Sequence, residues 1–429
     1  MLGNMPRLRR ERHLGWGGVR GKDRDTHTLS AAHKEDTSIC RRDPFDRRVK
    51  DMKKIIAVCF SLLLVCSAFC ARVGATEADK LPEEYYEMVE QLPDDLLDKL
   101  PDGIASEDTE SIGDTIMSLT SSEYVFSLIG ELFGEGLGGA VGLAARLCGI
   151  LVISAVFSSF KRSIGSDAVS GAIGFCSSCA VFAAIIEVEH KQILMVGEFF
   201  ERLNSLMLSM IPVTGAVYAM CGNVTTAATG SATMYAFLAV SEGICAKTIV
   251  PISSICLALA LCRSVSPDLN LQGISSGIKK CYTFVLGMIM TILIALLSAQ
   301  TSLSAAADST AARAAKMVAS TVIPVVGGSV SETLRTVASS VQYMKSIVGV
   351  GGIAFVLILL LPTLVTLLLN RLAFMAAGCI ADLLGCESES RLISDIGAIN
   401  GCMIATVSMC SVMFILALNI FIKTAVAIL

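Results

Sequence analysis

The sequence predicts an all-α, polytopic integral membrane protein, and three observations lead to this prediction. The chain has 429 residues, of which 53% are hydrophobic and only 17% are charged. Its mean hydropathy is +0.67, which lies outside the range of soluble globular proteins. Several uncharged runs reach about 20 residues, the length that a helix needs to cross a bilayer. We expect about seven or eight transmembrane helices, an additional re-entrant or broken helix, and a short exported acidic helical region.

The N-terminal residues 1–51 differ from the rest of the chain. They contain 13 Lys or Arg and 8 Asp or Glu, and they show no apolar periodicity. Met52 is then followed by two lysines and the uncharged run 55–71, with small residues at 73 and 75. This order is typical of a secretory signal peptide. We therefore interpret 52–75 as a signal peptide and 1–51 as an upstream artefact; the alternative is a real basic cytosolic tail.

Residues 76–135 form an acidic region with 17 Asp or Glu and only two lysines. Pro82, Pro93 and Pro101 are each followed by acidic and then apolar residues. Proline and carboxylates both suit the first turn of a helix. We expect two or three short amphipathic helices outside the cytoplasm, where the signal peptide would deliver them. The alternative is a solvated linker without stable structure.

Residues 136–429 form the predicted multipass transmembrane domain. The apolar runs suggest eight crossings, at 136–160, 168–186, 203–221, 224–241, 243–262, 281–301, 346–369 and 396–422. Residues 371–384, which contain Asp382, are expected to form an interfacial helix. Because Lys and Arg are almost equally divided between the two sides, the positive-inside rule does not orient the domain.

Residues 308–332 form the least ordinary segment of this domain. Its uncharged part, 317–331, is too short to span a bilayer, and Pro324 followed by Gly327 and Gly328 interrupts it. Broken backbone beside apolar helices is tolerated only where protein or water surrounds it. We therefore predict that this segment lines a cavity.

Two basic residues and a short repeat belong to the same prediction. Arg313 and Lys316 are three residues apart, hence on one face of a helix, and either line the cavity or snorkel to the membrane interface. The sequence Ile-Pro-Val-x-Gly at 323–327 also occurs at 211–215, where it contains Pro212 and Gly215. The two copies represent either half-sites of a duplicated unit or coincidence.

Small residues recur at every fourth position in two predicted crossings. The first series is Gly134, Gly138 and Gly142, and the second is Gly397 and Gly401. This spacing places small residues on one helix face, where a neighbouring helix can approach closely. It predicts helix packing, either within the chain or in a homo-oligomer.

Signals for enzymatic chemistry are nearly absent. His190 is the single histidine after the signal peptide, in an apparent acidic loop at 187–191. Glu242 and Lys247 flank an apparent break between two apolar runs, where a loop is favoured over a proton relay. Most of the 16 cysteines lie in apolar runs, where a thiol behaves as a small hydrophobe. We expect no enzyme, metal, cofactor or nucleic-acid partner.

Several segments in order resemble the stage III sporulation protein AE family. They are the signal sequence, LPDDLLDKLPDG in the acidic region, AARAAKMVASTVIPVVGGSVSETLRTVASS, and the following VGVGGIAFVLILLLPTLVTLLLNRLAF. The resemblance extends from Met52 to the C-terminus and is most specific from Arg313 to Gly328. The leader 1–51 departs from the family, which favours its interpretation as an artefact.

The resemblance implies a non-enzymatic sporulation protein of endospore-forming Firmicutes. It implies a multipass subunit of a channel-like complex in the mother-cell membrane around the forespore, with the acidic region extracytoplasmic. Its partners would be other membrane proteins of the same operon and, indirectly, a forespore membrane protein. The alternative is a secondary transporter with a broken-helix substrate site, since discontinuous helices build such sites.

Overall fold

The computed structural model describes residues 83–90, 109–164, 167–220, 232–265, 271–322 and 327–423. The chain divides into two compact units, Met1–Ile56 and Ala57–Leu429, and every described residue belongs to the second. The predicted leader 1–51 and signal peptide 52–75 lie outside the described residues and stay predictions.

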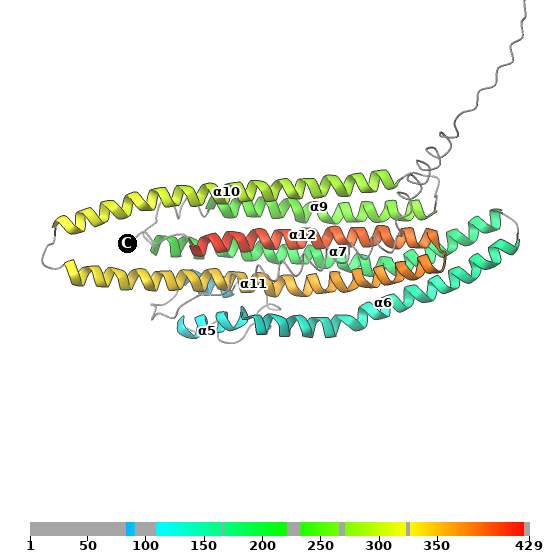
Figure 1. Ribbon diagram of the computed structural model, residues 1–429, viewed down its shortest axis with the longest axis horizontal. Coiled ribbons are helices and arrows are strands. Elements are labelled where there is room, and N and C mark those ends of the chain that lie inside the picture. Colours follow the sequence, from blue (N-terminus) through cyan, green and yellow to red (C-terminus); the bar gives the residue numbers. More distant parts are fainter. Residues whose placement is uncertain are drawn as a thin grey trace, which may run out of the picture. The chain divides into compact units, whose positions relative to one another are not determined.

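The described part of the chain is almost entirely helical, which confirms the predicted fold class (Figure 1). Its elements are α3 (Glu83–Glu90), α5 (Thr109–Leu119), α6 (Ser122–Ile164), α7 (Asp167–Met220), α9 (Ala232–Val265), α10 (Gln272–Val322), α11 (Gly327–Leu383) and α12 (Glu387–Lys423).

Five of these helices contain segments long and apolar enough to cross a membrane. The segments are Glu123–Phe157 in α6, Met234–Ser264 in α9, Gly273–Leu296 in α10, Ser339–Leu383 in α11 and Glu387–Ile422 in α12. Within the most apolar stretch, 83% of α11 and 67% of α12 is buried, against 22–28% in the other three. Helices α11 and α12 are therefore internal, and α6, α9 and α10 present apolar side chains outward.

Short helices do occur in the acidic region, as the prolines and carboxylates predicted. Tyr85 of α3 and Ile116 of α5 are almost fully buried in the main apolar core. Helix α3 packs on α7, and α5 packs on α11. The Ser121 hydroxyl then accepts the backbone N–H of Tyr124 at 3.2 Å and caps the start of α6. The extracytoplasmic position of this region stays a prediction.

Helix α7 is continuous where the sequence suggested two crossings and an intervening loop. It includes 168–186 and all but the last residue of 203–221, so the predicted loop at 187–191 is wrong. Lys191 pairs with Glu187 one turn earlier, Nζ to Oε1 2.8 Å, which supports the helix across its charged stretch. The helix also continues through Pro212.

The same correction applies to α9 and α11. The predicted break at Glu242 and Lys247 is wrong, because α9 runs from Ala232 to Val265. Residues 371–384 are not a separate interfacial helix, because α11 continues to Leu383. In all three helices charged residues at the edge of an apolar run led to a predicted end, although a helix can continue through charged side chains because its backbone hydrogen bonds do not involve them.

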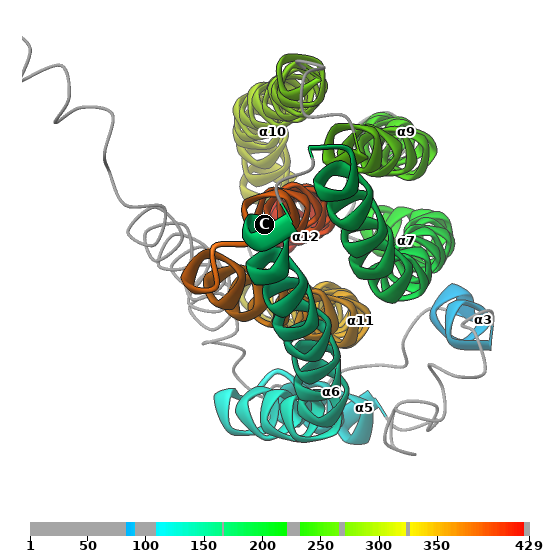
Figure 2. The same cartoon turned by 90° about the vertical axis from the view of Figure 1, so that its right-hand side faces the viewer.

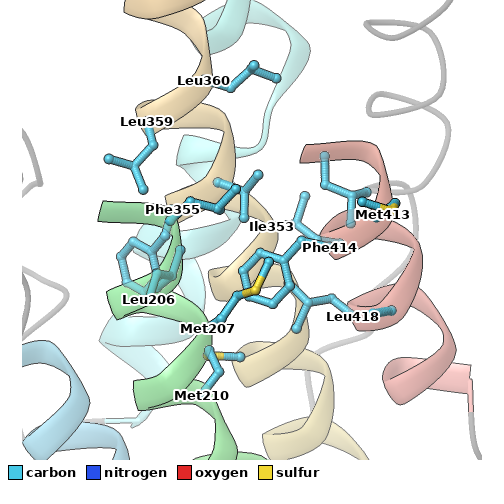
Figure 3. Close-up of a cluster of buried hydrophobic side chains, with 14 of the residues drawn as sticks. Leu206, Met207, Met210, Ile353, Phe355, Leu359, Leu360, Met413, Phe414 and Leu418 are labelled. Carbon is cyan, nitrogen blue, oxygen red and sulfur yellow. The ribbon is translucent and has the colours of Figure 1, made fainter. Parts of the chain in front are cut away.

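Helix α12 occupies the middle of the bundle, with α7, α9, α10 and α11 around it (Figure 2). Methionine and aromatic side chains from α7, α11 and α12 interlock in the main apolar core, including Met207, Phe355 and Phe414 (Figure 3). Glycine permits side chains of α12 and α7 to pack closely on α11: a Cβ at Gly352 would lie 2.8 Å from Leu418 Cδ1 and 3.0 Å from Met210 Cε.

A tight turn joins the two inner helices. Gly385 has φ +72°, a conformation that glycine adopts without steric cost. The N–H of Cys386 bonds the carbonyl of Ala381 at 2.9 Å, and the N–H of Gly385 bonds that of Asp382 at 3.2 Å. These two bonds form a Schellman motif, which ends α11 and positions the start of α12 beside the ends of α6, α7 and α9.

Candidate functional site

A polar cavity of about 360 Å³ lies where the α11–α12 turn meets α6, α7 and α9. Its lining is rich in hydroxyl and charged side chains. The lining residues include Ser154, Ser177, Arg263, Ser388, Glu389 and Asp395.

Glu389 connects three helices at one side of the cavity. Its side chain is 5% exposed, and its Oε1 accepts the Ser154 hydroxyl of α6 at 2.7 Å. Ser177 Oγ of α7 lies 2.5 Å from the same oxygen and 2.6 Å from Ser154 Oγ. The carboxylate also stands in the first turn of α12, where the helix dipole favours negative charge. A buried charge is thus satisfied by hydroxyls and backbone polarity.

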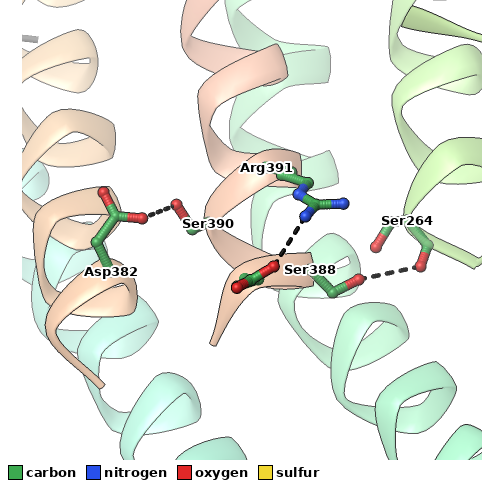
Figure 4. A network of polar contacts seen from close by, with 6 residues as sticks. Ser264, Asp382, Ser388, Ser390 and Arg391 are labelled. Atoms are coloured by element: carbon green, nitrogen blue, oxygen red, sulfur yellow. Dashed lines mark hydrogen bonds and ion pairs between the residues drawn. The ribbon is translucent and has the colours of Figure 1, made fainter. Parts of the chain in front are cut away.

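Arg263 and Asp395 connect α9 to α12 across the cavity. Arg263 Nη1 lies 2.6 Å from Asp395 Oδ2, and both side chains are less than one-fifth exposed. Ser388 donates to the backbone carbonyl of Ser264 at 3.2 Å, which adds a second link between the same helices (Figure 4). Partial burial makes such a pair stronger than one on the open surface.

The α11–α12 turn is tied to its own neighbours by further polar contacts. Ser390 donates to Asp382 across the turn, and Arg391 pairs with Glu387 at 2.8 Å on the exposed side (Figure 4). Cys386 lies in the turn, and burial raises the pKa of its thiol. A thiol with a raised pKa is a poor nucleophile, so the lining contains no activated one.

The charges of the cavity nearly balance. Arg263 and Arg391 face Glu387, Glu389 and Asp395, and each of these side chains already has a polar partner. Such a lining suits a polar, uncharged or zwitterionic small molecule better than a strong anion or cation. In the described ranges no cluster of three metal-binding side chains occurs.

The segment predicted to line a cavity lies elsewhere. Helix α10 ends at Val322 and α11 begins at Gly327, followed by Gly328, while Pro324 lies outside the described residues. Arg313 and Lys316 belong to α10, but their side chains are not among those described. The polar cavity is at the other end of the 57-residue α11, about 85 Å away. The cavity role of this segment stays a prediction.

The structure describes the first copy of Ile-Pro-Val-x-Gly and only the last residue of the second. Pro212 and Gly215 are inside the continuous helix α7, whereas the second copy falls between the described ends of α10 and α11. A Cβ at Gly215 would meet no atom of a described residue within 4 Å. Whether the two copies are half-sites of a duplicated unit or coincidence therefore stays open.

The two glycine series also differ from each other. A Cβ at Gly134, Gly138 or Gly142 would meet no atom of a described residue within 4 Å, so their packing role stays a prediction. Gly401 of α12 instead accommodates Arg371 of α11, whereas a Cβ at Gly397 would meet no atom of a described residue within 4 Å. The Arg371 guanidinium donates to the Gly397 carbonyl at 2.5 Å, and a Cβ at Gly401 would collide with it. Gly401 thus contacts a side chain rather than a helix backbone.

Sequence reasoning missed the polar cavity and three buried polar residues. Glu189 and Gln192 of α7 and Asn400 of α12 are each at most 2% exposed. Glu189 falls in the predicted loop at 187–191, and Asn400 falls within an apolar run that the sequence predicts as a crossing. Helical periodicity was the available signal, because 189 and 192 share a face with the apolar residues 185 and 196.

Comparison with known proteins bears on the identity of the bundle. The family model for stage III sporulation protein AE matches residues 109–425, which include every described helix from α5 to α12. Stage III sporulation protein AE of Bacillus subtilis (strain 168) is 23% identical over 314 residues, covering 71% of this chain and 76% of that protein. No solved structure shows significant similarity.

Proposed function

Because the chain belongs to the stage III sporulation protein AE family, and is thus a sporulation protein of the membrane, we propose that it is a subunit of a channel-like complex. The complex links the mother cell to the engulfed forespore and supports late forespore development. The chain lies in the mother-cell membrane, with its acidic N-terminal region extracytoplasmic, and it acts without enzymatic chemistry. The family match across the whole described bundle carries this proposal.

The distribution of apolar surface supports a subunit role. Helices α6, α9 and α10 expose large apolar side chains, such as Phe126 at 63%, Val240 at 62% and Phe284 at 72%. These faces suit contact with lipid and with other membrane proteins. The exposed Gly134 and Gly138 on α6 add a surface that a neighbouring helix can approach closely. The proposed partners are membrane proteins of the same operon or a second copy of the chain.

A secondary transporter is the alternative function, and the polar cavity favours it. A cavity of about 360 Å³ between helices, with balanced charges, is large enough for a small polar solute. In the channel-complex proposal, the polar residues that line the cavity instead stabilise the packing of four helix ends against one another.

Affinity purification from sporulating cells tests the subunit role. We expect that the tagged, full-length protein, extracted in mild detergent after engulfment, brings down the other membrane proteins of its operon, identified by mass spectrometry. An unrelated multipass membrane protein with the same tag, purified in parallel, is the control. Recovery without these proteins would contradict the proposal. A growth defect of the deletion strain in nutrient-limited vegetative culture would favour the transporter.

A further inference from the structure

A layer of buried polar residues separates the two apolar cores of the bundle. On α7, Ile185 belongs to one core and Val196 to the other. On α12, Ile399 and Met403 likewise belong to different cores. Glu189 and Gln192 of α7 and Asn400 of α12 stand between them, and their exposed fractions are 0%, 2% and 0%.

One hydrogen bond joins two of these residues, and several polar atoms of the three have no partner within the described part of the chain. Asn400 Nδ2 donates to Gln192 Oε1. Both carboxylate oxygens of Glu189, Gln192 Nε2 and Asn400 Oδ1 have no hydrogen-bond partner among the described residues. The two amides could be assigned the other way round, but either assignment leaves one amide oxygen available.

The carboxyl group of Glu189 needs neutralisation. A buried carboxylate without a partner costs several kcal/mol, so such groups bind a proton or a cation. Three of the charged groups nearby are engaged elsewhere: Lys191 pairs with Glu187 on the exposed side of α7, Arg371 binds the Gly397 carbonyl, and Arg263 pairs with Asp395. Lys279 of α10 acts electrostatically on Cys402, two residues from Asn400, but does not contribute to the environment of the Glu189 carboxyl group.

The available atoms define the chemistry of a ligand. Glu189 and Gln192 are three residues apart and share one face of α7, and the contact to Asn400 brings an amide group of α12 to that face. Carboxylate and amide oxygens are ligands for hard cations. Because the site has a single negative charge, a monovalent cation makes it neutral, whereas a divalent cation would leave a buried positive charge.

We propose that Glu189, Gln192 and Asn400 form a binding site for a hard monovalent cation, Na⁺ or K⁺, which exchanges with the proton of the Glu189 carboxyl group. The exchange is balanced: one alkali cation enters and one proton leaves to solvent. The site lies deep in the bundle, since Asn400 is about 20 Å along α12 from its first residue. It is separate from the polar cavity, and it does not depend on the sporulation role proposed above.

Thermal unfolding of the full-length protein in detergent tests this site. Helicity is followed by circular dichroism at pH 8.5, with NaCl or KCl replacing choline chloride at constant ionic strength. A ligand that binds only the folded state raises the melting temperature with its concentration. We expect a saturable rise with at least one alkali cation for the natural protein and none for Glu189→Gln.

Glu198→Gln is the matched control, because Glu198 is on the same helix with a side chain 64% exposed, and it is expected to respond like the natural protein. Asn400→Leu retains the carboxylate but loses the amide oxygen, and should need about tenfold more cation, equivalent to about 1.4 kcal/mol. This second variant keeps the test decisive if Glu189→Gln does not fold.

A direct count of protons completes the test. Addition of the effective cation to weakly buffered natural protein at pH 7 should release protons, and Glu189→Gln should release none. The proposal is overturned if neither Na⁺ nor K⁺ differs from choline, or if Glu189→Gln responds like the natural protein. A protein that responds to pH but to no alkali cation would reduce the site to a proton site and also overturn it.

Discussion

Glu189 shows most clearly how a single residue can matter in this bundle. It lies on α7, which is not among the five candidate membrane spans, and its side chain is fully buried. Burial raises the pKa of its carboxyl group from 4.5 to about 8. No neighbouring charge contributes to that shift, so it reflects desolvation of the charged form.

The raised pKa of Glu189 predicts how stability depends on pH. Between about pH 4.5 and pH 8 the folded protein retains a proton that the unfolded chain has released. Stability therefore falls as the pH rises through this window, and changes no further above it on account of this group. In choline chloride, the melting temperature of Glu189→Gln should fall less over this range than that of the natural protein.

Glu198→Gln again provides the control, and it should keep the full pH dependence. Equal pH dependence of the natural protein and Glu189→Gln would show that Glu189 is ionised in the fold, contrary to what its burial without a polar partner among the described residues predicts.

At the scale of the helix, the main feature of the bundle interior is the packing of α11 against α12. These two helices make the most extensive contact of the described part, and glycines make it possible. Gly352 faces Leu418 of α12 and Met210 of α7, and Gly401 faces Arg371. Larger side chains at such positions force neighbours out of their rotamers.

Gly352→Leu should therefore destabilise the bundle by about 1–3 kcal/mol, the usual cost of overpacking. The measurement is the melting temperature of the purified protein in detergent. Gly287→Leu on α10 is the matched control, because a Cβ there would meet no described atom within 4 Å. If the two variants melt at the same temperature, the close approach of α11 and α12 is wrong.

The sequence predicts the helical membrane class correctly but places several helix ends wrongly. Apolar runs identify the helical membrane class, because hydrophobic length is a local property. The carboxylates at 187–189 and at 242 predict loops at these positions, since a charged residue in an apolar run normally marks the membrane surface. The structure accommodates Glu189 and Glu242 inside helices instead, which depends on neighbours far away in the sequence.

The candidate site was beyond sequence reasoning for a related reason. Ser154, Ser177 and Glu389 are unremarkable one by one, and the serines lie 235 and 212 positions away from the carboxylate. They come together only in the folded bundle, where α7 and α12 run parallel to each other and α6 runs antiparallel to both. The segment 308–332 stands out by its composition, but its central residues 323–326 lie outside the described residues, so the predicted interruption stays a prediction.

For the whole molecule, the buried and exposed helices suggest different tasks. Helices α11 and α12 form the inner framework, and α6, α9 and α10 carry exposed apolar surface. An inner framework with apolar outer faces suits a subunit that is held among lipids and other membrane proteins. The family match extends over both the inner and the outer helices, so the proposed complex would use the entire bundle.

The most direct test of this role is the activity of a late forespore-specific reporter in a strain that lacks the gene. We predict normal vegetative growth and complete engulfment, followed by reporter activity close to background, with recovery when the full-length gene is supplied in the mother cell. Undiminished reporter activity and normal spore yield in the deletion strain would contradict the account.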